Sequence, residues 1–228
     1  MKPDSFGYKN AWLAIKGVQP GAVADALPLR NVRPAAWDTG IKAAYEHPIT
    51  CAVFVTPAID GWVLCVGFPL FGPVDARPPE LGLLAAEWAA KMQTEVQYFA
   101  THRIVEAHAW ARARPSGLER AYVHVGESGE TVLDFGSHTA EERALGFAFF
   151  DSSSPEAQAD GYWERQDLAY VGEENVMALA ARWSVDPSSL AERDLEVAEG
   201  LLGDFGEPPS PPPVEAGPPQ KPWWKVWK

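Results

Sequence analysis

The sequence predicts an α+β fold in which helices pack on one side of a mostly antiparallel sheet. Of the 228 residues, 46% are hydrophobic, which suffices for a sizeable core. Apolar runs of strand length are separated by turn residues, which indicates hairpins, and segments with helical periodicity lie between them. We therefore expect one α+β domain over residues 1–205 and a disordered, proline-rich tail over residues 206–228.

The N-terminal part of the chain predicts a strand, a short helix and an apolar hairpin. AWLAIKG is typical of a buried strand, and VQPGAVADAL of a helix with Pro20 near its start. Trp37, Ile41 and Tyr45 then recur at the helical period. ITCAVFV and WVLCVGF are joined by Pro, Asp and Gly, so they predict a hairpin that is covered on both faces or lies centrally in the sheet.

A helix follows Pro79, with Leu81, Leu84, Trp88 and Met92 on one face that packs against the sheet. The stretch from Val96 to Phe135 then predicts a three-stranded meander at the centre of the sheet. Its first strand is VQYFATHRIVEAHAWARAR, and its turns are PSG and SG.

The register of the meander follows from its first turn. A three-residue loop with Gly117 in the left-handed region pairs Arg114 with Leu118. Steps of two residues then set Arg112 opposite Arg120, Trp110 opposite Tyr122 and His108 opposite His124, all on one face. The other face carries Ala and Val, which are small enough for the helix around Trp88 to approach closely.

The polar face of the meander holds the candidate functional residues. They are Glu106, His108, Trp110, Arg112, Tyr122 and His124. We interpret them as a partner-binding surface and assign no catalytic residue, because cross-strand pairs of this kind are also common on solvated sheet faces. Two histidines with a carboxylate are also the pattern of a metal site or a general base, so this alternative stays open. Arg112 opposite Arg120 needs a counter-charge, from Glu106, Glu119 or an acidic group elsewhere.

The C-terminal part predicts three short helices. Thr139 and Glu142 fit a capping box at the first. GEENVMALAARW forms the second, and DPSSLAERDLEVAEGLL the third, with Asp186 as its cap and Pro187 at its first position.

The tail ends in WWKVWK, which places Trp223, Trp224 and Trp227 beyond a flexible spacer. Exposed aromatic side chains of this kind are candidates for partner binding. They could also dock back onto the domain or touch a membrane surface, and all three interpretations stay open.

Composition excludes several function classes. A formal charge of -12 and a pI near 4.8 disfavour nucleic acid and favour a basic protein partner or a cationic ligand. The start, MKPDSFGYKN, has no apolar core of signal-peptide length, and no apolar run is long enough for a membrane helix, so we expect a cytoplasmic protein. Cys51 and Cys65 are expected to be reduced core residues. Without a CxxC, dinucleotide or P-loop pattern, the sequence predicts no cofactor and assigns no metal.

The order of these elements, with GWVLCVG at Gly61 to Gly67 and VQYFATHRIVEAHAWARA after it, is similar to uncharacterised bacterial cytoplasmic proteins, some of the toxin-immunity type. The resemblance covers the first two thirds of the chain and implies no catalytic residue. From the negative charge, the lack of a catalytic signature, the cytoplasmic character and the aromatic, polar sheet face, we expect a non-enzymatic, immunity-type binding protein that neutralises a basic toxin or effector. The alternatives are an enzyme that uses Glu106, His108 and His124, and an adaptor that acts through its C-terminal Trp motif.

Overall fold

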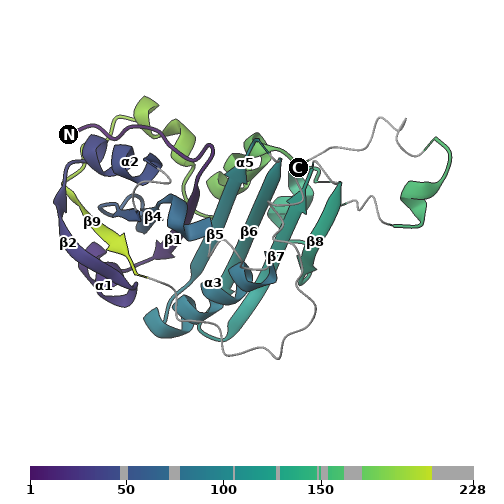
Figure 1. Ribbon diagram of the computed structural model, residues 1–228, viewed down its shortest axis with the longest axis horizontal. Helices are drawn as coiled ribbons and strands as arrows, with labels where there is room; N and C mark the ends of the chain where they lie inside the picture. The colour runs from purple at the N-terminus through teal and green to yellow at the C-terminus, as the bar shows by residue number, and fades with distance from the viewer. Residues whose placement is uncertain are drawn as a thin grey trace.

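A computed structural model describes residues 1–46, 51–71, 78–104, 106–126, 129–147, 149, 154–161 and 171–206. These residues form a nine-stranded sheet in the order β2-β9-β3-β4-β1-β5-β6-β7-β8, in which all paired neighbours are antiparallel (Figure 1). The predicted α+β class with an antiparallel sheet is confirmed. Beyond Gly206, the predicted tail with Trp223, Trp224 and Trp227 lies outside the described residues.

The elements have the following bounds. The strands are β1 (Ala11–Lys16), β2 (Leu29–Ala35), β3 (Ala52–Val55), β4 (Trp62–Val66), β5 (Val96–His102), β6 (Ala107–Arg114), β7 (Gly117–Val125), β8 (Glu130–Phe135) and β9 (Gly200–Phe205). The α-helices are α1 (Pro20–Ala26), α2 (Trp37–Tyr45), α3 (Pro78–Met92), α4 (Ala140–Ala144) and α5 (Glu173–Trp183). Short 3-10 helices are η1 (Phe68–Phe71), η2 (Glu156–Gln158) and η4 (Pro187–Glu192).

Helices cover both faces of the sheet, whereas the sequence predicted helices on one side. The strands send alternate side chains into two cores. One core packs α1 and α3 against residues such as Leu13 and Ala111. The other packs α2 and α5 against residues such as Trp12 and Phe99, whose rings stack at 5.2 Å. Strands with apolar residues on both faces require this double cover.

The middle strand of the sheet is β1, not the meander. It lies between β4 and β5 and has five fully buried residues, Ala11 to Ile15. The predicted hairpin of β3 and β4 lies beside it, and both of its strands are buried throughout, as expected from their continuous apolar runs.

The meander has four strands instead of three and ends at the β8 edge of the sheet. Its first predicted strand is split into β5 and β6 by a turn that includes Arg103, Ile104 and Glu106, and Glu106 takes a left-handed backbone (φ 48°). This turn was missed because it contains neither glycine nor proline. The helix α3 packs across β5, β6 and β7 on the Ala and Val face, as predicted (Figure 1).

The predicted register of β6 and β7 is confirmed for its three cross-strand pairs. His108 lies opposite His124, Trp110 opposite Tyr122, and Arg112 opposite Arg120. The turn itself differs, because Arg114 pairs with Gly117 and not with Leu118. A bulge after Arg112 absorbs the extra residue and restores the alignment.

Two strands were not expected from the sequence. The edge strand β2 has mostly exposed residues, and β9 replaces the end of the predicted third C-terminal helix, of which only η4 forms. A Cβ on Gly200 of β9 would lie 2.5 Å from the Val55 carbonyl oxygen, so glycine allows this strand to approach β3 closely.

Both cysteines are free. Cys65 is buried as expected, but Cys51 is exposed and does not belong to the core. Within the described ranges, no helix combines the length and apolar character needed to cross a bilayer.

Candidate functional site

The face of β6 and β7 that holds the predicted site residues is largely covered. Trp110, Tyr122 and His124 are each 1% exposed and His108 is 4% exposed. These four side chains therefore do not form an exposed sheet surface, and their role in partner binding stays a prediction. Cover from α4, α5 and the aromatic segment after α4 is a long-range contact, which residue alternation along a strand cannot reveal.

One end of this face is closed by a buried ion-pair network. Arg120 is fully buried, and its Nε donates to Glu142 Oε1 at 2.8 Å. Trp110 Nε1 donates to the same oxygen at 2.7 Å. Arg120 also reaches Asp134, with 2.5 Å between its Nη1 and Oδ1. We call this end of the β6–β7 face the closed end.

Glu142 also caps α4. Its backbone N–H donates to Thr139 Oγ1, and its carboxylate accepts from the Thr139 backbone N–H, so the predicted capping box is confirmed. The carboxylate thus fixes the start of α4 and neutralises Arg120 at the same time. Glu142, which lies outside the meander, is thus an acidic group that supplies the counter-charge expected for the Arg112–Arg120 pair.

Aromatic rings complete the closed end. Trp110 and Tyr122 lie 4.6 Å apart between ring centroids, and Phe149 meets Tyr122 edge-on at 4.9 Å. Arg112 pairs with Glu119 at 3.3 Å, one of its expected partners, and its guanidinium lies over the Trp183 ring. These contacts give Trp110, Arg112 and Tyr122 structural roles.

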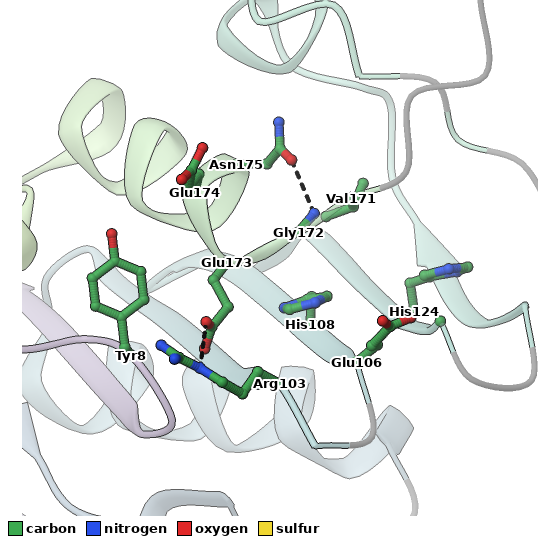
Figure 2. A pocket seen from close by; sticks show the side chains of 11 residues that line it. Tyr8, Arg103, Glu106, His108, His124, Val171, Gly172, Glu173, Glu174 and Asn175 are labelled. Carbon is green, nitrogen blue, oxygen red and sulfur yellow. Dashed lines mark hydrogen bonds and ion pairs between the residues drawn. The ribbon is translucent and has the colours of Figure 1, made fainter. Parts of the chain in front are cut away.

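The other end of the same face opens into a cleft of about 880 Å³. Its walls come from the turn before β1, the β5–β6 turn, the ends of β6 and β7, and the N-terminus of α5. The lining residues are Tyr8, Arg103, Glu106, His108, His124, Gly126, Val171, Gly172, Glu173, Glu174 and Asn175. We call this the open end. Figure 2 shows Glu173 and Arg103 on one side of His108, and Glu106 and His124 on the other.

Glu173 ties the walls of the cleft together. Its Oε1 accepts from Thr101 Oγ1 at 2.7 Å and from the Lys9 backbone N–H at 3.2 Å. Its Oε2 lies 2.9 Å from Arg103 Nε, the ion pair marked in Figure 2. Because these three partners come from the N-terminal turn, β5 and the β5–β6 turn, Glu173 positions α5 against the sheet and has little capacity left for a ligand.

The start of α5 is fixed by its own sequence. Asn175 Oδ1 accepts from the Gly172 backbone N–H at 2.9 Å. This bond occupies one of the donors that a helix N-terminus leaves unpaired. The first turn also holds Glu173 and Glu174, whose negative charge suits the positive end of the helix dipole.

His108 is the most unusual group in the cleft. Its Nδ1 is buried and has no hydrogen-bond partner among the described residues. Burial lowers its pKa to about 4, further lowered by His124 and His102 and partly offset by the negative charge of Glu173. His108 is therefore a neutral imidazole at physiological pH. Across the strand pair, His124 Nδ1 lies 3.4 Å from Thr131 Oγ1.

Glu106 lies at the cleft mouth on the β5–β6 turn, not on the strand face where it was predicted. Its backbone carbonyl accepts from the Gly126 N–H at 2.9 Å, which ties this turn to the end of β7. The structure thus brings Glu106, His108 and His124 into one cleft. It leaves Trp110, Arg112 and Tyr122 at the closed end.

The sequence prediction named only Glu106, His108 and His124 among the lining residues. Tyr8 and Glu173 come from parts of the chain far from the meander, and Arg103 lies on the unpredicted β5–β6 turn, with its guanidinium 5.6 Å from the Tyr8 ring centroid. The pattern GEEN, with Asn three residues after Gly, could have marked a capped helix start with two carboxylates, but no local pattern places that helix beside His108.

The chemistry available in the cleft is limited. None of its described lining residues is Ser, Thr or Cys, so no hydroxyl or thiol nucleophile of that kind faces it. A histidine with a pKa of about 4 is a weak base at neutral pH, because a general base works best when its pKa lies near that pH. In the part of the chain that the structure describes, no group of three His, Cys, Asp or Glu side chains could hold a metal ion.

Comparison with known proteins finds no matching family, curated relative or solved structure.

Proposed function

We propose that the protein is a non-enzymatic binding protein that recognises a positively charged protein partner. In its specific form, the proposal is an immunity-type factor that occludes a basic toxin or effector domain in the cytoplasm. The weak basicity of His108 and the absence of a Ser, Thr or Cys among the described lining residues support binding over catalysis.

An acidic strip carries this proposal. From Glu192, the last residue of η4, to Glu199, just before β9, Leu195 and Val197 pack against the core and four exposed carboxylates lie between and beside them. The four are Glu192, Asp194, Glu196 and Glu199, and none forms an ion pair with another described residue. Backbone bonds between Met1 and Val197 hold the strip in place. A fixed row of like charges speeds the approach of an oppositely charged protein.

The test is to recover partners of the intact chain from its source cells and to measure association rates over a range of salt concentrations. We expect a basic protein whose association slows steeply with salt. Neutralising the strip (Glu192→Gln, Asp194→Asn, Glu196→Gln, Glu199→Gln) should lower the association rate about tenfold at low salt. The matched control Glu87→Gln, on exposed α3 residue Glu87 at the opposite face, should leave it unchanged. An acidic partner, or association indifferent to salt, would contradict the proposal.

A second candidate is an enzyme, which one observation favours: Glu106, His108 and His124 line the same cleft. The metal content of the purified protein and of His108→Ala and His124→Ala variants separates the two functions. A stoichiometric metal that both variants lose would support the enzyme and weaken the binding proposal.

A further inference from the structure

The described domain ends at the same end of the sheet as the cleft. One row of paired residues crosses the sheet from β9 to β7 and faces the core under α2 and α5; its members are Leu202, Phe54, Val66, Trp12, Phe99, Trp110 and Tyr122. Two residues further in one direction, β9 reaches Asp204 and β6 reaches His108 of the cleft. Gly206, the last described residue, therefore lies at the cleft end of the sheet.

The tryptophans that follow Gly206 in the sequence are within reach of the cleft. We call residues 221–228, KPWWKVWK, the Trp segment. Five strand intervals separate β9 from β6, which is about 24 Å at the usual spacing of neighbouring strands. Residues 207–222 connect Gly206 with Trp223, and their proline-rich sequence predicts a spacer of up to about 50 Å. The spacer is therefore long enough for the Trp segment to reach the cleft.

The Trp segment and the domain carry opposite charges. The segment has three lysines and no acidic residue, whereas the whole chain has a formal charge of -12. The cleft has the sign of the domain, because it is lined by three glutamates and one arginine, Glu106, Glu173, Glu174 and Arg103. This negative field attracts a basic segment of the same chain and repels an acidic one.

Exposed apolar surface beside the cleft suits tryptophan. Tyr8 lines the cleft and is 37% exposed, and Ile104, on the same β5–β6 turn as Arg103, is 72% exposed (Figure 2). The Tyr45 hydroxyl donates to the Tyr8 carbonyl at 3.0 Å, so a third exposed ring continues this surface towards α2. Tryptophan joins a large apolar ring to a single N–H donor, which fits a site of mixed apolar and polar character. The cleft volume of about 880 Å³ is large enough for an indole.

We propose that the Trp segment docks onto its own domain at the open end, with a tryptophan ring in the cleft beside Tyr8. The spacer holds the segment at an effective concentration on the order of 1 mM, so a contact too weak to form between separate molecules is populated within one chain. The docked segment covers the cleft. This inference goes beyond the proposed function and does not depend on the identity of any partner.

The first test follows the imidazole NMR signals of the full chain. In a variant with Trp223→Ser, Trp224→Ser and Trp227→Ser, the signals of His108 and His124 should shift, because an indole ring leaves the cleft that both residues line. His138, at the closed end, is the internal control and should keep its signal. Unchanged His108 and His124 signals, or an equal shift of His138, would overturn the inference. The first of these results is also expected if the segment binds only a separate protein or a membrane.

The length of the spacer gives the second test. Deleting residues 207–220 leaves Lys221 and Pro222 between Gly206 and Trp223, about 11 Å of extended chain, so Trp223 and Trp224 no longer reach the cleft. The signals should then move towards those of the triple variant. Replacing residues 207–220 with Gly and Ser at equal length should preserve the wild-type signals. Wild-type signals in the deletion variant, or signals that change on dilution, would contradict docking within one chain.

Variants of the domain locate the docking surface. Docking should slow tryptic cleavage after Lys225 in the wild type relative to the triple variant. Ile104→Ser removes exposed apolar surface beside the cleft and should speed this cleavage about fivefold. Val32→Ser, which changes an exposed apolar residue of the outer strand β2, is the matched control and should leave the rate unchanged. Equal rates in the two variants would contradict docking at the open end.

Discussion

The closed and open ends of the β6–β7 face each contain a cross-strand pair of polar or aromatic residues. They differ in whether the polar groups of these residues find partners. At the closed end, Arg120 and the indole of Trp110 share the carboxylate of Glu142, and every one of these side chains is buried. At the open end, the carboxylate of Glu173 is engaged by Arg103 and Thr101, and His108 Nδ1 meets no described partner.

The difference shows that the helix packed over a strand determines whether a polar strand residue is paired within the core or stays without a partner. Helix α4 brings a carboxylate with free acceptor capacity, so its strand partners become part of the core. Helix α5 brings carboxylates that are already paired or point to solvent, so the strand face beside it stays available. Each end keeps a buried nitrogen without a described hydrogen-bond partner, Arg120 Nη2 and His108 Nδ1, but only Arg120 is neutralised by an adjacent carboxylate.

The largest effect is expected at the closed end. Glu142→Ala should lower the free energy of unfolding by about 3–5 kcal/mol, because it leaves Arg120 buried without its main counter-charge and also removes the α4 cap. Urea unfolding measures the loss. Glu141→Ala, the neighbouring residue of the same helix, is the control and should cost less than about 1 kcal/mol. Equal losses would show that the buried network does not hold the closed end.

The open end should make stability depend on pH. The unfolded chain protonates His108 near pH 6.5, but the folded protein does so only near pH 4. Between these values the unfolded state binds more protons, so this contribution, present in full above pH 6.5, is lost as the pH falls through that range. It amounts to about 3 kcal/mol, since each pKa unit corresponds to about 1.4 kcal/mol.

His108→Gln isolates this contribution from the carboxylates that also titrate in acid. The difference in unfolding free energy between the wild type and the variant should change by that amount between pH 7 and pH 4. Urea unfolding at a series of pH values measures it, and a difference that stays constant would place His108 in a water-like environment.

Substitutions of two glycines, one beside each end, compare how rigid the two ends are. Gly136, beside the closed end, has φ 80°, and a Cβ there would clash with the backbone oxygen of Glu119. Gly136→Ala should therefore cost about 2 kcal/mol. At Gly126 the added Cβ would meet Cβ and Oε2 of Glu106 at 2.8 Å, so the β5–β6 turn must shift, but Gly126 does not have a left-handed backbone. Gly126→Ala should therefore cost less, about 1 kcal/mol. Thermal unfolding compares the two, and the reverse order would contradict the assignment of the rigid end.

The smallest effect on stability is expected for Arg103. Its ion pair with Glu173 is half exposed on the arginine side, so Arg103→Ala should cost less than about 1 kcal/mol. Arg114→Ala, an equally exposed arginine beside Glu95 and Glu119, should match this stability loss. Urea unfolding compares the two variants, and a much larger loss for Arg103→Ala would show that its exposed ion pair contributes more than the account allows.

The sequence was most informative where contacts are local. The period-two alternation and the PSG turn were enough to align His108, Trp110 and Arg112 with their partners, because pairing across a hairpin follows from nearby residues. The capping box of Thr139 and Glu142 was likewise a local pattern. The turn that splits β5 from β6 was hidden because Glu106, rather than glycine, adopts the left-handed backbone.

The rest could not be predicted because it depends on distant segments. Pairing of β2 with β9 joins strands from opposite ends of the described chain, and β2 lacks the apolar alternation of a strand. The candidate site likewise depends on contacts between segments that are distant in the sequence. His108 was identified, but its burial and its neighbours Tyr8 and Glu173 follow from how α5 and the N-terminal turn fold over the sheet.

The contrast between the two ends is tested most directly by the pKa of His108, measured by NMR of its imidazole in the intact chain. A buried, neutral imidazole without a charged partner should titrate near pH 4. A pKa close to 6.5 would mean that water or a carboxylate already satisfies the ring, and the open end would then be an ordinary solvated surface.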